Sequence, residues 1–107
     1  MNINLYFFSR VLALQLSPQT GEDYLKEALA SSIFNPNPES KSKLSVSEKK
    51  AKDYIQRGVN AENVFVQTEE TLKASEVLGC DDPIVEYADV CDTLSNAMIA
   101  FTISLKK

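Results

Sequence analysis

The stretch GCDDPIVEYADVCDTLSNAMIAFTISL, residues 79–105, decides the fold that we expect. Gly79 suits the end of one helix, and Asp82 followed by Pro83 suits the cap and the first position of the next. From there apolar side chains recur at alternating spacings of three and four residues, namely Ile84, Tyr87, Cys91, Leu94, Met98, Phe101 and Leu105. This spacing predicts an amphipathic helix that begins at about Pro83 and runs to the end of the stretch.

The end of this stretch also allows a second interpretation. Residues 101–105 alternate between apolar and polar side chains, a period that is typical of a half-buried strand. A short C-terminal strand, and with it an α+β fold, is therefore the alternative to an all-α fold.

Two more helices are expected in the N-terminal third. Residues 2–16 are apolar on several sides, and Pro18 stops this segment. Thr20 and Asp23 have the spacing of a capping box, so a second helix should begin there and end before the Asn-Pro-Asn-Pro sequence at 35–38.

The middle of the chain predicts a loop followed by one or two helices. Residues 35–47 are rich in Pro, Ser and Lys and offer little to pack, so we expect a mobile surface loop. Helices over 48–57 and 60–78 should follow, with Gly58 ending the first of them. One uninterrupted helix over 48–78 is the alternative, because a single glycine costs a helix only about 1 kcal/mol.

Together these segments predict one all-α domain over residues 1–107, a small antiparallel bundle of four or five helices. Leu, Ile, Val and Phe make up 30 of the 107 residues, enough apolar surface for a core.

Composition argues against most catalytic chemistry. The chain has no His, the commonest general base and a frequent metal ligand. With only three Gly residues and no glycine-rich motif, no phosphate-binding loop is expected. We therefore expect a protein that is not an enzyme and that holds no cofactor and no dedicated metal site.

The two cysteines and the N-terminal segment bear on location. The spacing of the two cysteines, Cys80 and Cys91, matches neither a zinc site nor a redox pair, so we predict two reduced structural thiols. A disulfide is the alternative, if the intervening turn folds back. The apolar run over residues 5–16 carries Arg10 in its middle, which suits neither a signal peptide nor a membrane span, so we expect a cytoplasmic protein without a membrane partner.

Charge predicts the kind of partner. The chain has 11 basic and 15 acidic residues, a net charge of -4, which argues against nucleic acid. Four carboxylates should project from the face of the last helix opposite its apolar stripe: Asp82, Glu86, Asp89 and Asp92. We interpret this face as a docking surface for a basic partner protein. Small immunity proteins, antitoxins and secretion chaperones share this physical character, which is a likeness of class and not of family.

The sequence also allows two alternative functions. The apolar N-terminal residues Tyr6, Phe7 and Val11 predict an interface, which would suit a homo-oligomeric structural subunit. Glu86 and Asp89, one helical turn apart, leave weak binding of a divalent cation as the other alternative.

Overall fold

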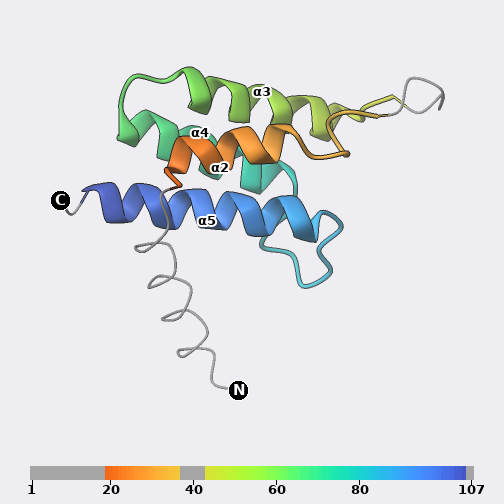
Figure 1. Cartoon of the computed structure of the whole chain (residues 1–107). Helices are drawn as coiled ribbons and strands as arrows, with labels where there is room; N and C mark the ends of the chain where they lie inside the picture. Colours follow the sequence, from red (N-terminus) through yellow and green to blue (C-terminus); the bar gives the residue numbers. More distant parts are fainter. Residues whose placement is uncertain (1–18, 37–42, 106–107) are drawn as a thin grey trace.

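The computed structural model describes residues 19–36 and 43–105, which form four helices and no strand (Figure 1). The helices are α2 (Gly21–Leu29), α3 (Val46–Asn60), α4 (Val64–Val77) and α5 (Ala88–Leu105). The all-α prediction is confirmed, and the alternative of a strand over 101–105 is wrong because these residues form the last turn of α5. The predicted helix over 2–16 and residues 37–42 of the predicted loop lie outside the described residues.

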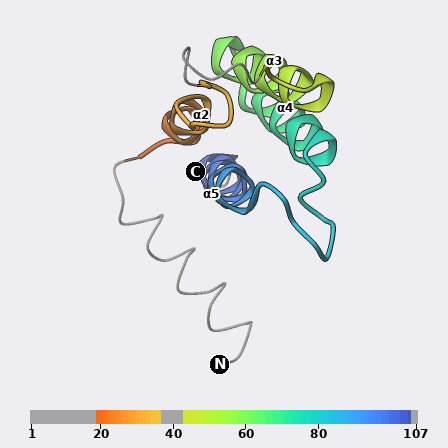
Figure 2. The same ribbon diagram turned by 90° about the vertical axis from the view of Figure 1, so that its right-hand side faces the viewer.

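Helices that follow one another along the chain run antiparallel. Along the chain, α2, α3, α4 and α5 alternate in direction, and Figure 1 shows α3 and α4 forming a hairpin behind α2. Each helix packs against two others: α2 and α4 each contact both α3 and α5. The view along the helices in Figure 2 shows α2 beside α5, with the α3–α4 pair covering them on one side.

Side-chain caps fix where the first helices begin. At α2, Asp23 N–H donates to Thr20 Oγ1 over 3.1 Å and Thr20 N–H donates to Asp23 Oδ2 over 3.0 Å, the capping box that the sequence predicts. At α3, Ser45 and Glu48 form a second capping box, so this helix begins at Val46 and not at 48.

The segment over 48–78 forms two helices, so the single-helix alternative is wrong. The first does not end at Gly58 as predicted, but continues to Asn60. Ala61 is then extended, and the Asn63 side chain caps α4 by accepting from Val66 N–H over 2.9 Å. Gly58 instead serves packing, because a Cβ there would lie 3.0 Å from Leu25 Cδ1 of α2.

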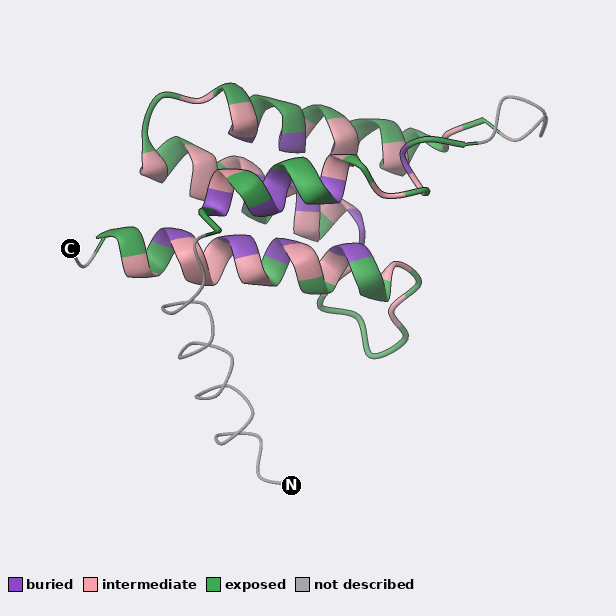
Figure 3. Ribbon diagram, in the orientation of Figure 1, coloured by how far each residue is buried: buried purple, intermediate pink, exposed green. Residues whose placement is uncertain are grey.

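The core lies between the four helices, and Figure 3 shows the buried residues on their facing sides. Its buried apolar residues come from every helix and from the turns beside them: Tyr24, Leu25, Ala28, Phe34, Ala51, Ile55, Ala74, Leu78, Val90, Leu94, Ala97 and Phe101.

The stripe expected on the last helix is partly wrong. The helix begins at Ala88, five residues later than Pro83, so Ile84 lies outside it. Four residues of α5 are buried at spacings of four, three and four: Val90, Leu94, Ala97 and Phe101. The helical period was read correctly, but the buried face is rotated toward Val90 and Ala97.

A close contact at Gly21 connects α2 to α5. Gly21 is the first residue of α2 and is buried, and a Cβ built on it would overlap the ring of Phe101. The absence of a side chain here lets the N-terminal end of α2 lie directly on the aromatic ring.

Gly21→Ala is therefore expected to destabilise the protein. Alanine favours a helix by about 1 kcal/mol over glycine, but the added methyl group overpacks the contact at a cost of about 1–3 kcal/mol. Urea unfolding should give a lower free energy of unfolding for the variant. In a Phe101→Leu background the same substitution should cost less, and a gain in stability in the Phe101 background would contradict the contact.

Candidate functional site

The connection between α4 and α5, together with the first turns of α5, carries the strongest concentration of negative charge in the chain. Residues 81–92, here called the acidic segment, contain five carboxylates and no basic residue. They are Asp81, Asp82, Glu86, Asp89 and Asp92, and all five residues are exposed. Figure 1 shows the connection protruding from one end of the bundle.

The segment begins at a fixed point, because α4 ends in a tight glycine-containing cap. Gly79 has a φ of 69°, the left-handed conformation that glycine adopts without strain. Two hydrogen bonds complete this turn, from Gly79 N–H to Glu76 O over 3.1 Å and from Cys80 N–H to Ser75 O over 3.0 Å. The cap reverses the chain and leads it toward the start of α5.

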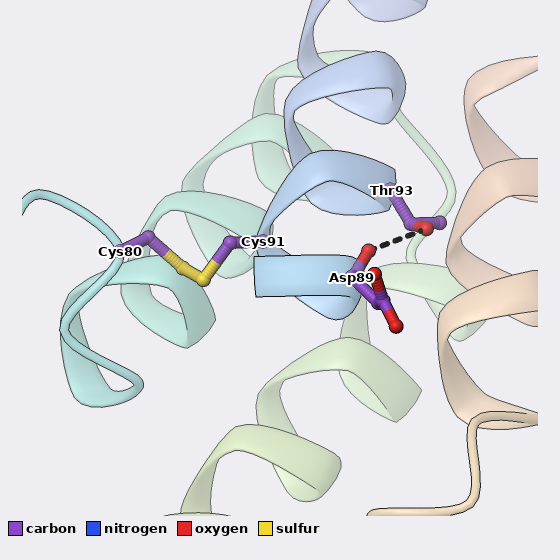
Figure 4. The surroundings of a disulfide bond; sticks show 4 residues. All are labelled: Cys80, Asp89, Cys91 and Thr93. Atoms are coloured by element: carbon purple, nitrogen blue, oxygen red, sulfur yellow. Dashed lines mark hydrogen bonds between the residues drawn. A yellow bond between two sulfur atoms is a disulfide. The ribbon is translucent and has the colours of Figure 1, made fainter. Parts of the chain in front are cut away.

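A disulfide between Cys80 and Cys91 closes the segment (Figure 4). The two Cα atoms lie 5.5 Å apart, although the residues are 11 positions apart in the sequence. The prediction of two reduced thiols is therefore wrong. It assumed a helix from Pro83, which would carry Cys91 away from Cys80, whereas α5 begins at Ala88 and the chain folds back before it.

A second restraint joins the acidic segment to α3. The Tyr87 hydroxyl donates to Glu48 Oε2 over 3.0 Å, and the other carboxylate oxygen of Glu48 accepts from Ser45 N–H over 2.7 Å. The hydrogen bond from Ser45 N–H is the main cause that lowers the pKa of the Glu48 carboxyl below its usual value of 4.5. Burial raises this pKa, and the hydrogen bond from the Tyr87 hydroxyl lowers it further. The bond to Glu48 also raises the pKa of Tyr87.

The structure separates the predicted docking residues into two groups. Asp82 and Glu86 lie in the connection before α5, and Asp89 and Asp92 lie in its first two turns. The predicted single helical face is therefore wrong, although all four residues are exposed and lie within one segment. Tyr6, Phe7 and Val11, the predicted apolar interface, lie outside the described residues.

Ile84 is the residue of this segment that sequence reasoning placed wrongly. It was assigned to the buried stripe, but 88% of it is exposed. The signal that could have shown this is the sequence Asp81-Asp82-Pro83 before it, since these residues favour a turn as much as a helix start. An exposed isoleucine among carboxylates gives the segment an apolar contact point.

Another exposed apolar surface lies on α4. Phe65 and Leu72 are 72% and 44% exposed, and Val66 beside them is 39% exposed. The inward face of α4 carries the smaller Thr71 and Ala74 instead, which let the helix approach its neighbours closely.

Within the described residues, no group of three or more His, Cys, Asp or Glu side chains could hold a metal ion. The carboxylates of the acidic segment are thus not gathered around a common point. None of the described helices has the length and apolar character needed to cross a bilayer.

Comparison with known proteins adds no family to this description. No protein-family model matches the chain, and searches of curated proteins and of solved structures found no significant match.

Removing the disulfide should lower stability. By the chain-entropy relation for a loop of this length, the Cys80→Ala/Cys91→Ala variant is expected to lose roughly 3 kcal/mol of unfolding free energy. Thermal unfolding of the protein with and without a dithiol reductant should show the same loss, and the variant should not respond to the reductant. Two titratable thiols in the unreduced, denatured protein would contradict the bond.

The Glu48 carboxylate predicts a dependence of stability on pH. Its pKa is lowered in the folded state, so its stabilising contribution is complete above pH 4.5 and is lost as the pH falls through the folded-state pKa. Glu48→Gln should be less stable than the natural protein at about pH 7, and the difference should shrink as the pH falls below 4.5. Melting temperatures of both proteins over these pH values test the prediction. A stability difference that stays constant with pH would show that the charge of Glu48 does not contribute to stability.

Proposed function

We propose that this protein is a non-enzymatic protein-binding module whose acidic segment docks onto a basic and partly apolar surface of a partner protein. The observation that carries the proposal is the exposure of Ile84, 88%, within a segment that holds five carboxylates and no basic residue. An apolar contact point surrounded by charge is the usual composition of a recognition site with an apolar centre and a polar rim.

The restraints on the segment support this function. The cap at Gly79, the Cys80–Cys91 disulfide and the Tyr87–Glu48 hydrogen bond all hold a part of the chain that is otherwise exposed. A recognition segment that is ordered before binding loses less conformational entropy in the complex. The carboxylates then contribute mainly to the rate of association and to the rejection of acidic partners.

The disulfide also affects the expected location. Disulfides persist in oxidising compartments and are uncommon in the cytosol. The bond between Cys80 and Cys91 therefore favours an oxidising compartment over the cytoplasm that the sequence alone predicts. Mass spectrometry of the alkylated native protein, isolated from its source under acid quench, would decide between the two.

Charge reversal in the acidic segment tests the proposal. The probe is a synthetic peptide of lysine and leucine, with binding measured by fluorescence anisotropy. Glu86→Lys/Asp89→Lys should weaken binding at least about tenfold while the melting temperature stays nearly unchanged, and the affinity of the natural protein should fall as salt rises.

The matched control is Glu62→Lys/Glu76→Lys, which changes the net charge equally at two exposed positions near the ends of α4. It should keep most of the affinity. Equal losses in both double variants would mean that only net charge matters and would overturn the proposed docking site.

A further inference from the structure

The exposed part of the acidic segment is held at its two ends. Residues 81–84 are all exposed, so packing against the bundle contributes little to their positions. At one end, the turn after α4 is closed by a hydrogen bond from Asp82 N–H to Gly79 O, 3.0 Å long. At the other end, Val90 of α5 is buried in the core. The conformation of the exposed part therefore depends on how closely these two ends are held together.

The Cys80–Cys91 disulfide is the covalent bond between these ends. Figure 4 shows it linking the chain just after α4 to the first turn of α5. The loop that it closes contains Ile84 and every carboxylate of the acidic segment except that of Asp92. Closing a loop restricts the conformations that its residues can adopt. The bond therefore limits the positions of Ile84 and of these carboxylates.

This bond can be opened and formed again. Cys80 and Cys91 are the only cysteines of the chain, so reoxidation has a single intramolecular product. Both residues are half-buried and pack against the core from its edge. A thiol reagent can therefore reach the bond, which matters because thiol–disulfide exchange requires access to a sulfur atom.

The helices beside the bond are also held by packing. Leu78 and Val90, close to the two cysteines in the sequence, are buried. Helix α5 packs against α2 as well as against α4. These contacts are noncovalent and remain when the disulfide is opened. Opening the bond should therefore loosen the acidic segment and leave the four helices in place.

We infer that the Cys80–Cys91 disulfide is a redox switch for docking, in which the oxidised protein binds its partner through an ordered acidic segment and the reduced protein binds weakly. The inference rests on the proposed function, because it concerns the regulation of the same site. A loosened segment must be ordered again when it binds, and the conformational entropy lost in that step lowers the affinity.

A dithiol reductant operates the switch. One thiolate of the dithiol attacks a sulfur atom of the disulfide, the bond between Cys80 and Cys91 breaks, and a mixed disulfide forms. The second thiolate of the dithiol then attacks the mixed disulfide and frees the protein. The protein gains two electrons and two protons as two thiols, and the dithiol is oxidised to a cyclic disulfide.

Binding of the lysine and leucine peptide in both redox states tests the inference. Fluorescence anisotropy should give an affinity at least about fivefold lower after reduction with dithiothreitol, and reoxidation should restore it. The Cys80→Ser/Cys91→Ser variant should bind as weakly as the reduced protein, with and without dithiothreitol. Equal affinities of the oxidised and reduced natural protein, or a response of the variant to dithiothreitol, would overturn the inference.

A control variant separates the disulfide from the other restraint on the segment. Tyr87→Phe removes the hydrogen bond to Glu48 and leaves both cysteines in place. Its affinity for the peptide should still fall when the disulfide is reduced. Loss of this response would overturn the inference, because the disulfide alone would then not hold the segment.

Hydrogen exchange and circular dichroism distinguish loosening from unfolding. The backbone N–H of Cys91 donates to Tyr87 O over 2.9 Å and should exchange faster in the reduced protein. The backbone N–H of Ile55, which is buried in α3, should stay protected, and the helical signal should not change. A reduced protein without its helices would overturn the inference, because the affinity would then be lost with the fold.

Failure of this inference differs from failure of the proposed function. If both redox states bind the peptide equally and Glu86→Lys/Asp89→Lys weakens both, the switch is excluded and the docking site stands. If the oxidised protein does not bind the peptide, the proposed function fails and the switch fails with it.

Discussion

The close approach of the helices depends on small residues at their contacts. Each helix buries one alanine, namely Ala28, Ala51, Ala74 and Ala97. Two glycines extend the same constraint, since Gly21 lies under the ring of Phe101 and Gly58 lies against Leu25. Large side chains at these positions would separate the helices and leave voids that a core of this size could not fill. The larger core residues pack around these contacts.

The acidic segment is held by bonds that differ in kind and in range. The cap at Gly79 is local, the Cys80–Cys91 disulfide spans 11 positions, and the bond from Tyr87 to Glu48 spans 39. Because the last of these reaches the capping box of α3, the start of that helix and the position of the acidic segment depend on each other. The proposed docking of a partner and the stability of the helix end are thus connected through one carboxylate.

Features that depend on neighbouring residues were predicted well. The capping box of Thr20 and Asp23 and the helix end at Gly79 were both found, because each is made by hydrogen bonds within a few positions. The inward face of α5 was predicted less well, because it is rotated toward Val90 and Ala97. On α4, Phe65 and Leu72 are apolar and yet exposed, while Thr71 and Ala74 are the buried residues of this helix. The sequence showed where the carboxylates cluster, but not that Ile84 is exposed among them.

By itself the sequence determined the helical class and the acidic character of residues 81–92, since periodicity, caps and charge are properties of short stretches. Only the tertiary structure decided that Cys80 and Cys91 meet, that α5 begins at Ala88, and that the acidic segment adjoins the start of α3. These outcomes depend on where the chain turns back on itself, and that is set by packing between helices distant in sequence, which local patterns do not record.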